Sequence, residues 1–170
     1  MELPEKLEPD NPIWRFALAF WQKPGTQRTC LALQDRGWSV TRILCAGWLA
    51  LEGRPYSGTE HATVTEWRQH VTGALRAVRR YLPKGHEHCQ TLREGVAGLE
   101  LQAEQLELAL AWQQFATETP DKAHMTGHAQ LIRNNLAAAA YRPEQATDAA
   151  AELNTLADIL ASFSNGDSQP

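Results

Sequence analysis

The feature that most constrains the fold is a run of apolar residues at helical spacing between residues 59 and 82. We call these residues the apolar seam. They follow one another at alternating spacings of three and four: Val64, Trp67, Val71, Ala74, Val78 and Leu82. Such spacing is typical of a long helix that packs against another long helix. After a break at Pro83 and Gly85, a second helical pattern extends from about His86 to Ala116. The sequence therefore predicts a long central antiparallel hairpin.

The second arm of this hairpin is apolar on two roughly opposite sides, so we expect other parts of the chain to cover both sides. One stripe contains Leu92, Val96, Leu99, Ala103, Leu106 and Leu110, and the other contains Leu101, Leu108, Trp112 and Phe115.

The chain opens with another predicted helix, in the run NPIWRFALAFWQKPG at residues 11–25. Asn11 can cap free backbone N–H groups, and Pro12 fits a first helical turn because it has no N–H to satisfy. The helix should end before Pro24 and Gly25. Its core-facing stripe is predicted to be Ile13, Phe16, Ala17 and Phe20.

Four further helices are predicted from turn signals and apolar spacing, at residues 26–36, 39–51, 121–140 and 144–163. The helix at 39–51 is apolar on most sides, so we expect it at a buried centre where Gly47 permits close contact. No segment shows the period-2 alternation of a strand. The sequence therefore predicts an all-α bundle of about seven helices.

The composition favours one folded domain, since the 170-residue chain is 43% hydrophobic and 21% charged. We expect this domain at residues 11–163, with a flexible leader at 1–10 and a disordered tail at 164–170. The chain has 16 Lys and Arg against 20 Asp and Glu, a net charge of −4. This balance argues against broad wrapping around nucleic acid.

The same sequence predicts a cytoplasmic location. The leader is acidic and Arg15 interrupts the opening apolar run, unlike a secretion signal. No uncharged stretch approaches the roughly 20 residues that span a bilayer. Three widely spaced cysteines, an odd number outside any ligand box, indicate a reducing compartment. Cys30 and Cys45 are expected to be core thiols.

Cations gather at the end of the first hairpin arm, and acids lie along the second arm at Glu100, Glu104 and Glu107. If the hairpin turns near Lys84, residues equally distant from the turn face each other. Arg68 is then expected to reach Glu100, whereas Arg76 faces the neighbourhood of Leu92. The hairpin end is therefore predicted to be locally basic, with Arg76, Arg79, Arg80, Lys84 and Arg93 as its anion-binding or partner-binding residues.

Two interpretations of these arginines stay open. Guanidinium forks bind phosphate or carboxylate groups in two-point fashion, which predicts an anion site or an acidic partner. Alternatively, the arginines form a solvated helix flank with internal salt bridges, favoured by the helix dipole near a C-terminus.

No motif predicts a reaction, a metal or a cofactor, and we favour a protein that is not an enzyme. His86, His88 and Cys89 have poor spacing for a metal site, and His124 and His128 lack the acid of an HExxH motif. There is no GxSxG, phosphate-binding loop or GxGxxG pattern.

The six tryptophans give a further signal. Trp48 and Trp67 lie on apolar stripes and are expected in the core. Trp38, in the turn DRGWS, and Trp21, before QKPG, are candidates for partly exposed anchors in a partner's pocket.

Several segments together carry a family resemblance. They are NPIWRFALAFWQKPG, CLALQDRGW, WLALEG, the segment from Trp67 through LRAVRR, and LREGVAGLELQAEQLEL, which together span residues 11 to about 112. The chain resembles uncharacterised proteobacterial proteins of about this length that form a family of unknown function. This resemblance implies a bacterial cytoplasmic protein with an all-helical fold, and it brings no known activity, cofactor or catalytic residue.

Two functions follow as hypotheses. We favour a small helical adaptor or regulator that binds a protein, with RNA as the second choice, through the basic hairpin end and a nearby Trp. The alternative is a helical bundle with an internal small-ligand or enzymatic pocket. The residues of that pocket or of a structural network would be Trp48, Trp67, Arg68, Glu100 and Glu104.

Overall fold

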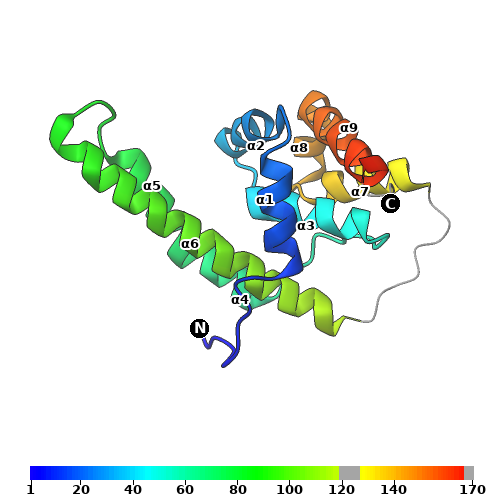
Figure 1. Cartoon of the computed structure of the whole chain (residues 1–170), viewed down its shortest axis with the longest axis horizontal. Helices are drawn as coiled ribbons and strands as arrows, with labels where there is room; N and C mark the ends of the chain where they lie inside the picture. Colours follow the sequence, from blue (N-terminus) through cyan, green and yellow to red (C-terminus); the bar gives the residue numbers. More distant parts are fainter. Residues whose placement is uncertain (119–126, 167–170) are drawn as a thin grey trace. The chain divides into compact units, whose positions relative to one another are not determined.

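The computed structural model describes residues 1–118 and 127–166, and all regular structure within these ranges is helical (Figure 1). Nine α-helices and one π-helical segment follow one another in the described residues. The all-α prediction is therefore confirmed. The chain divides into two compact units, Met1–Trp14 with Glu60–Thr117 (unit 1) and Arg15–Thr59 with Glu118–Pro170 (unit 2). The single domain over residues 11–163 stays a prediction.

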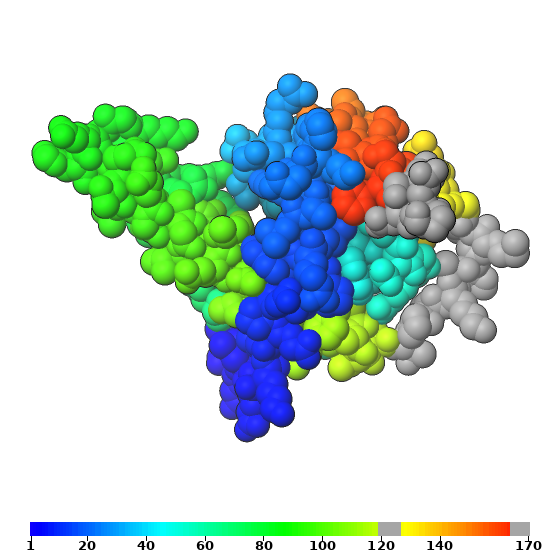
Figure 2. All heavy atoms as spheres, viewed as in Figure 1, coloured from blue at the N-terminus to red at the C-terminus, as the bar shows by residue number. Residues whose placement is uncertain are grey.

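Unit 1 is built around one long helix, α6 (Glu87–Thr117). Three consecutive helical segments pack against it: α4 (Ala62–Trp67), the π-helix η1 (Arg68–Thr72) and α5 (Gly73–Tyr81). In Figure 1, α5 and α6 lie side by side, and their heavy atoms form one continuous body in Figure 2. The helix predicted from Thr59 begins three residues later and contains a π-helical segment that its spacing did not predict.

The π-helix changes which residues face α6. Val64 and Trp67, before the π-helix, are 1% and 9% exposed, whereas Val78, after it, is 49% exposed. A π-helix has more residues per turn than an α-helix, so it rotates the residues that follow away from a strict 3.6-residue period. The predicted apolar seam is therefore buried only in its first part.

The first turns of α6 also differ from the prediction that both of its sides are covered. Leu92, Leu99 and Leu101 are 54%, 52% and 54% exposed. Further along the helix, both stripes contain buried residues, which are Leu108 and Phe115 of one stripe and Leu110 of the other. The two-sided apolar pattern therefore describes the second half of α6 and fails in its first half.

Unit 2 contains the rest of the helices, and α1 (Pro12–Trp21) begins in unit 1 and continues into unit 2. Here α3 (Val40–Leu51) packs against α7 (His128–Ala138), and α7 packs against α9 (Ala150–Gly166). The first residues of the helix predicted at 121–140 lie outside the described residues, and the helix predicted at 144–163 is two helices. The other helices of this unit are α2 (Thr26–Asp35) and α8 (Pro143–Asp148).

Two details of the predicted helices are confirmed. The Asn11 side-chain oxygen accepts a hydrogen bond from the backbone N–H of Trp14 at 3.0 Å, which caps α1. Gly47 lies in buried α3, where an added Cβ would stand only 3.2 Å from Leu160 and 3.3 Å from Phe16. Glycine therefore allows close packing there, since a larger residue would push the Leu160 and Phe16 side chains aside. Trp38 is 4% exposed, so its prediction as a partly exposed anchor is wrong.

Two buried polar side chains tie unit 2 together. The Arg42 guanidinium donates to backbone carbonyls at the end of α7, including Ala139 O at 2.9 Å and Ala138 O at 3.2 Å. The Asn135 side chain accepts from the Tyr56 backbone N–H at 2.9 Å and donates to Arg54 O at 2.9 Å. Each side chain satisfies backbone groups that a helix end or a turn leaves without an intrahelical partner.

Candidate functional site

The contact between α5 and α6 centres on an arginine–glutamate network of Arg76, Arg79, Glu100 and Glu104. Arg76 donates through Nε to Glu100 Oε1 at 2.8 Å and through Nη2 to Glu104 Oε1 at 2.6 Å. Arg79 donates through Nε to Glu100 Oε2 at 2.5 Å and through Nη2 to Glu100 Oε1 at 3.2 Å. Glu100 thus accepts hydrogen bonds from two arginines and holds α5 against α6.

This network corrects the predicted pairing of the two arms. Arg76 was expected near Leu92, but it reaches Glu100, which lies twice as far from Lys84 along the chain. Helix side chains lean toward the N-terminus of their own helix. In an antiparallel pair the arginines therefore lean away from the turn and the glutamates lean toward it. Long side chains on both arms make the offset large.

A second charged cluster, Glu60, Arg68 and Glu107, lies in the same unit. Arg68 forms a two-point contact with Glu60 at 2.6 and 2.7 Å, and its Nε donates to Glu107 at 2.7 Å. The prediction that Arg68 reaches Glu100 is therefore wrong. Glu60 was missed; it lies eight residues before Arg68, in the segment just before α4 begins.

The Trp67 indole N–H donates to the backbone carbonyl of Ala103 at 2.9 Å. Trp67 therefore fixes the packing of α4 on α6, and its partner is the protein backbone. Trp48, on α3, belongs to unit 2, whereas Trp67, Arg68, Glu100 and Glu104 belong to unit 1.

The acids of the network differ in their electrostatics. Burial raises the pKa of the Glu100 carboxyl, but the hydrogen bond from Arg79 and the charges of Arg76 and Arg79 lower it more, so its net pKa lies below its ordinary value. Burial raises the pKa of Glu104, and the attraction of Arg76 does not offset this. The hydrogen bond with Glu100 raises the pKa of Arg79. Glu100 is therefore the carboxylate that the two arginines stabilise most.

At the end of the α5–α6 pair lies an exposed group that we call the tip, Arg80, Tyr81 and Lys84. Tyr81 is 90% exposed, and both cations are exposed. Sequence reasoning missed Tyr81, although its position between the basic residues was a usable signal. Arg93 instead donates through Nη1 to the backbone carbonyls of Arg79 and Leu82, which closes the turn.

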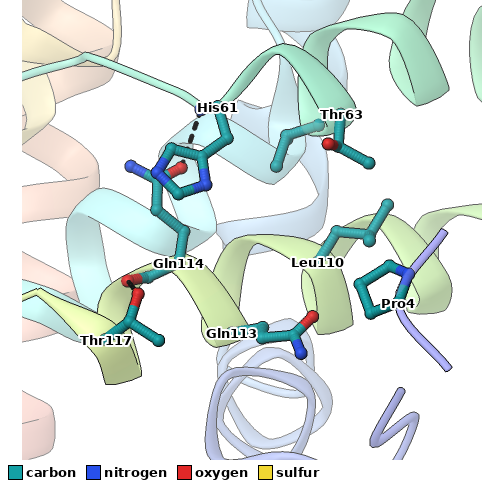
Figure 3. A pocket seen from close by; sticks show the side chains of 8 residues that line it. Pro4, His61, Thr63, Leu110, Gln113, Gln114 and Thr117 are labelled. Atoms are coloured by element: carbon teal, nitrogen blue, oxygen red, sulfur yellow. Dashed lines mark hydrogen bonds between the residues drawn. The ribbon is translucent and has the colours of Figure 1, made fainter. Parts of the chain in front are cut away.

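Unit 1 also contains an open pocket of about 240 Å³ (Figure 3). His61 and Gln114 lie together on its wall, and the His61 backbone N–H donates to the Gln114 side-chain oxygen at 2.9 Å. The pocket is below the usual size range of small-molecule sites. None of the residues predicted to line an internal pocket lines this one; its lining is Pro4, His61, Thr63, Val64, Leu110, Gln113, Gln114 and Thr117.

The histidine-rich segment at the start of α6 shows no metal geometry. The rings of His86 and His88 lie 5.8 Å apart, and Cys89 is half-buried. No group of three or more His, Cys, Asp or Glu side chains in the described residues is arranged to hold a metal ion. His124 lies outside those residues. Among the described helices, none has the length and apolar character needed to cross a membrane.

The fold and the site define an all-helical protein whose longest helix is held to its neighbour by partly buried arginine–glutamate contacts. Residues 12–111 match the model of the family described as "Protein of unknown function (DUF2390)". The chain belongs to this family. No curated protein and no solved structure matches it.

Proposed function

We propose that this chain is a small helical adaptor or regulator that binds a protein partner through the tip. The observation that carries this proposal is the 90% exposure of Tyr81 beside two exposed cations, Arg80 and Lys84. Tyrosine and arginine are enriched among the residues that dominate interface energies. A partner segment with acidic side chains complements this tip, since opposite charge speeds encounter and selects partners.

The arginine–glutamate network supports the tip in this proposal and does not contact the partner. Arg76 already binds Glu100 and Glu104, and Arg79 binds Glu100, so a partner's anion would have to displace the buried Glu100 carboxylate. RNA is the second choice of partner, because the chain has a net charge of −4. A bacterial cytoplasmic setting also stays part of the proposal.

The test uses the full chain as bait in a lysate of the organism that encodes it, at low and high ionic strength. Tyr81→Ala and the double variant Arg80→Glu with Lys84→Glu should each lose a protein that the wild type captures, and salt should weaken that capture. A double charge reversal at Arg28 and Arg133, two exposed arginines of unit 2, is the matched control. Capture that all variants share, or no capture at low ionic strength, would overturn the proposal.

A further inference from the structure

A second surface of the α5–α6 pair is exposed and apolar. Val78 on α5 and Leu92 and Leu99 on α6 are 49%, 54% and 52% exposed. On α6, Leu92 and Leu99 share one helical face with Gly95, at i, i+3 and i+7. We call this surface the apolar side; its residues are Val78, Leu92, Gly95, Leu99 and Gln102.

Helical geometry places these residues on one side of the pair. The arginine–glutamate network marks the faces that α5 and α6 turn toward each other. On α5, Val78 lies about a third of a turn from the face that carries the network. On α6, Leu92 and Leu99 lie about a third of a turn from the corresponding face, in the same rotational sense about their own helix axis. Because the two helices run in opposite directions, residues that are rotated equally and in the same sense from the two contact faces lie on the same side of the helix pair.

The apolar side carries no charge. The exposed residues that border it on α6 are His88, Thr91 and Gly98, and none of them adds to the formal charge at pH 7, whereas Glu87 and Glu94 lie around the opposite flank of the helix. Contiguous exposed apolar patches larger than a few hundred Å² are uncommon on monomeric proteins and mark interaction sites.

Gly95 adds a second signal. It lies inside α6, where glycine is less favourable than alanine because its backbone loses more freedom. A Cβ added at Gly95 would meet nothing within 4 Å, so packing within the chain does not require glycine there. The missing side chain instead leaves a depression between Leu92 and Leu99 for a closely approaching partner.

We propose that the apolar side is the interface of a homodimer, occupied by the same side of a second copy. Two-fold symmetry sets the same patch of both copies face to face, so a charged patch would repel itself. This uncharged patch does not. In an antiparallel arrangement, Leu99 of each copy packs over Gly95 of the other, which makes the surface complementary to itself in shape. The two helix pairs then form a four-helix arrangement.

This inference goes beyond the proposed function and uses a different surface from the tip. Its test measures the mass of the full chain in solution over a range of concentrations, by sedimentation or light scattering. The wild type should form a dimer. Leu99→Gln should raise the dimer dissociation constant about tenfold or more, since the leucine would occupy a central packing position.

Leu101→Gln is the matched control, because Leu101 is 54% exposed and lies on the opposite face of the same helix. The dimer dissociation constant of the Leu101→Gln variant should equal that of the wild type. A wild type that stays monomeric at every concentration would refute the homodimer. Equal weakening by Leu99→Gln and Leu101→Gln would refute the assignment of the side.

Gly95→Ala keeps the test decisive if Leu99→Gln fails to fold. Alanine should raise the melting temperature of the dilute monomer, because it favours the helix, and weaken the dimer, because it fills the depression. A purely structural glycine would not show these opposite changes. The tip variants should leave the dimer intact, so failure of partner capture and failure of dimerisation are read separately.

Discussion

Glu100 is the residue whose loss should most directly test how the α5–α6 pair is held together. Its side chain is 7% exposed and bridges Arg76 and Arg79. Glu100→Gln keeps the size of the side chain and removes its charge, so two guanidinium groups face a neutral amide. Hydrogen bonds to charged groups contribute about 1.5–3 kcal/mol, more than those between neutral groups.

The magnitude follows from burial. Breaking a fully buried ion pair costs about 3–5 kcal/mol, whereas an exposed pair contributes about 0.2–1 kcal/mol. Arg76 and Arg79 are 18% and 28% exposed, and Arg76 keeps its contact with Glu104. We therefore expect Glu100→Gln to lower the free energy of unfolding by about 2 kcal/mol, an intermediate value.

The assay is equilibrium unfolding in urea, with Glu94→Gln as the control. Glu94 is an exposed acid on the same helix that accepts from Gln90, so its loss should change the free energy of unfolding by no more than about 0.5 kcal/mol. A double-mutant cycle with Arg79→Gln should give a coupling of about 1 kcal/mol. A cost for Glu100→Gln no larger than that for Glu94→Gln would refute the network as the contact that holds α5.

The pH dependence gives an independent check on Glu100. Its pKa is lowered on folding, so its stabilising contribution is present above the ordinary value of 4.5 and is lost as the pH falls through the folded value. Folding raises the pKa of Glu104, so protonation of this carboxyl stabilises the folded state. This contribution has the opposite sign to that of Glu100 and grows as the pH falls toward 4.5. Below pH 4.5, the wild type should therefore lose stability more steeply than Glu100→Gln, and parallel curves would contradict the assignment.

Three more predictions concern Asn135 and Arg42 of unit 2 and the cysteines of both units. Asn135→Ala should lower the free energy of unfolding by about 2–4 kcal/mol in urea titration, because it leaves buried backbone partners without hydrogen bonds. Arg42→Met should cost about 3 kcal/mol, and Arg42→Lys should not restore it, since one ammonium group cannot satisfy the spread carbonyls that the guanidinium binds. A thiol reagent at neutral pH should modify Cys89 first and spare Cys30, because burial raises the Cys30 pKa to about 12; rapid labelling of Cys30 in the native protein would contradict its burial.

Local sequence signals predicted the helices well because each depends on neighbouring residues. The cap at Asn11 and the close packing at Gly47 could both be predicted from residue type and position. The sequence did not predict that Trp38 is buried, because burial of a turn residue depends on what packs over it. Local chemistry thus specifies where a helix begins, and tertiary packing decides which turn residues are covered.

The candidate site was harder to predict for a geometric reason. The sequence pattern assigns Arg76 and Arg79 to an anion-binding hairpin end, and Glu100 and Glu104 to a separate pocket or network, whereas the structure brings all four together. Their pairing was wrong because the prediction matched backbone positions and ignored the opposite lean of long side chains on antiparallel helices. A register rule that includes side-chain direction would have paired Arg76 with Glu100.

The second half of the apolar seam remains exposed at Val78. Val78 continues a spacing that calls for an apolar neighbour, yet α6 meets α5 through Arg76, Arg79 and Glu100. The charged contact uses the face that the π-helix turns inward, and this leaves Val78 on the same side as Leu92 and Leu99. Val78 therefore has no apolar neighbour within its own helix pair. In the proposed homodimer, the apolar side of a second copy of the chain provides that neighbour.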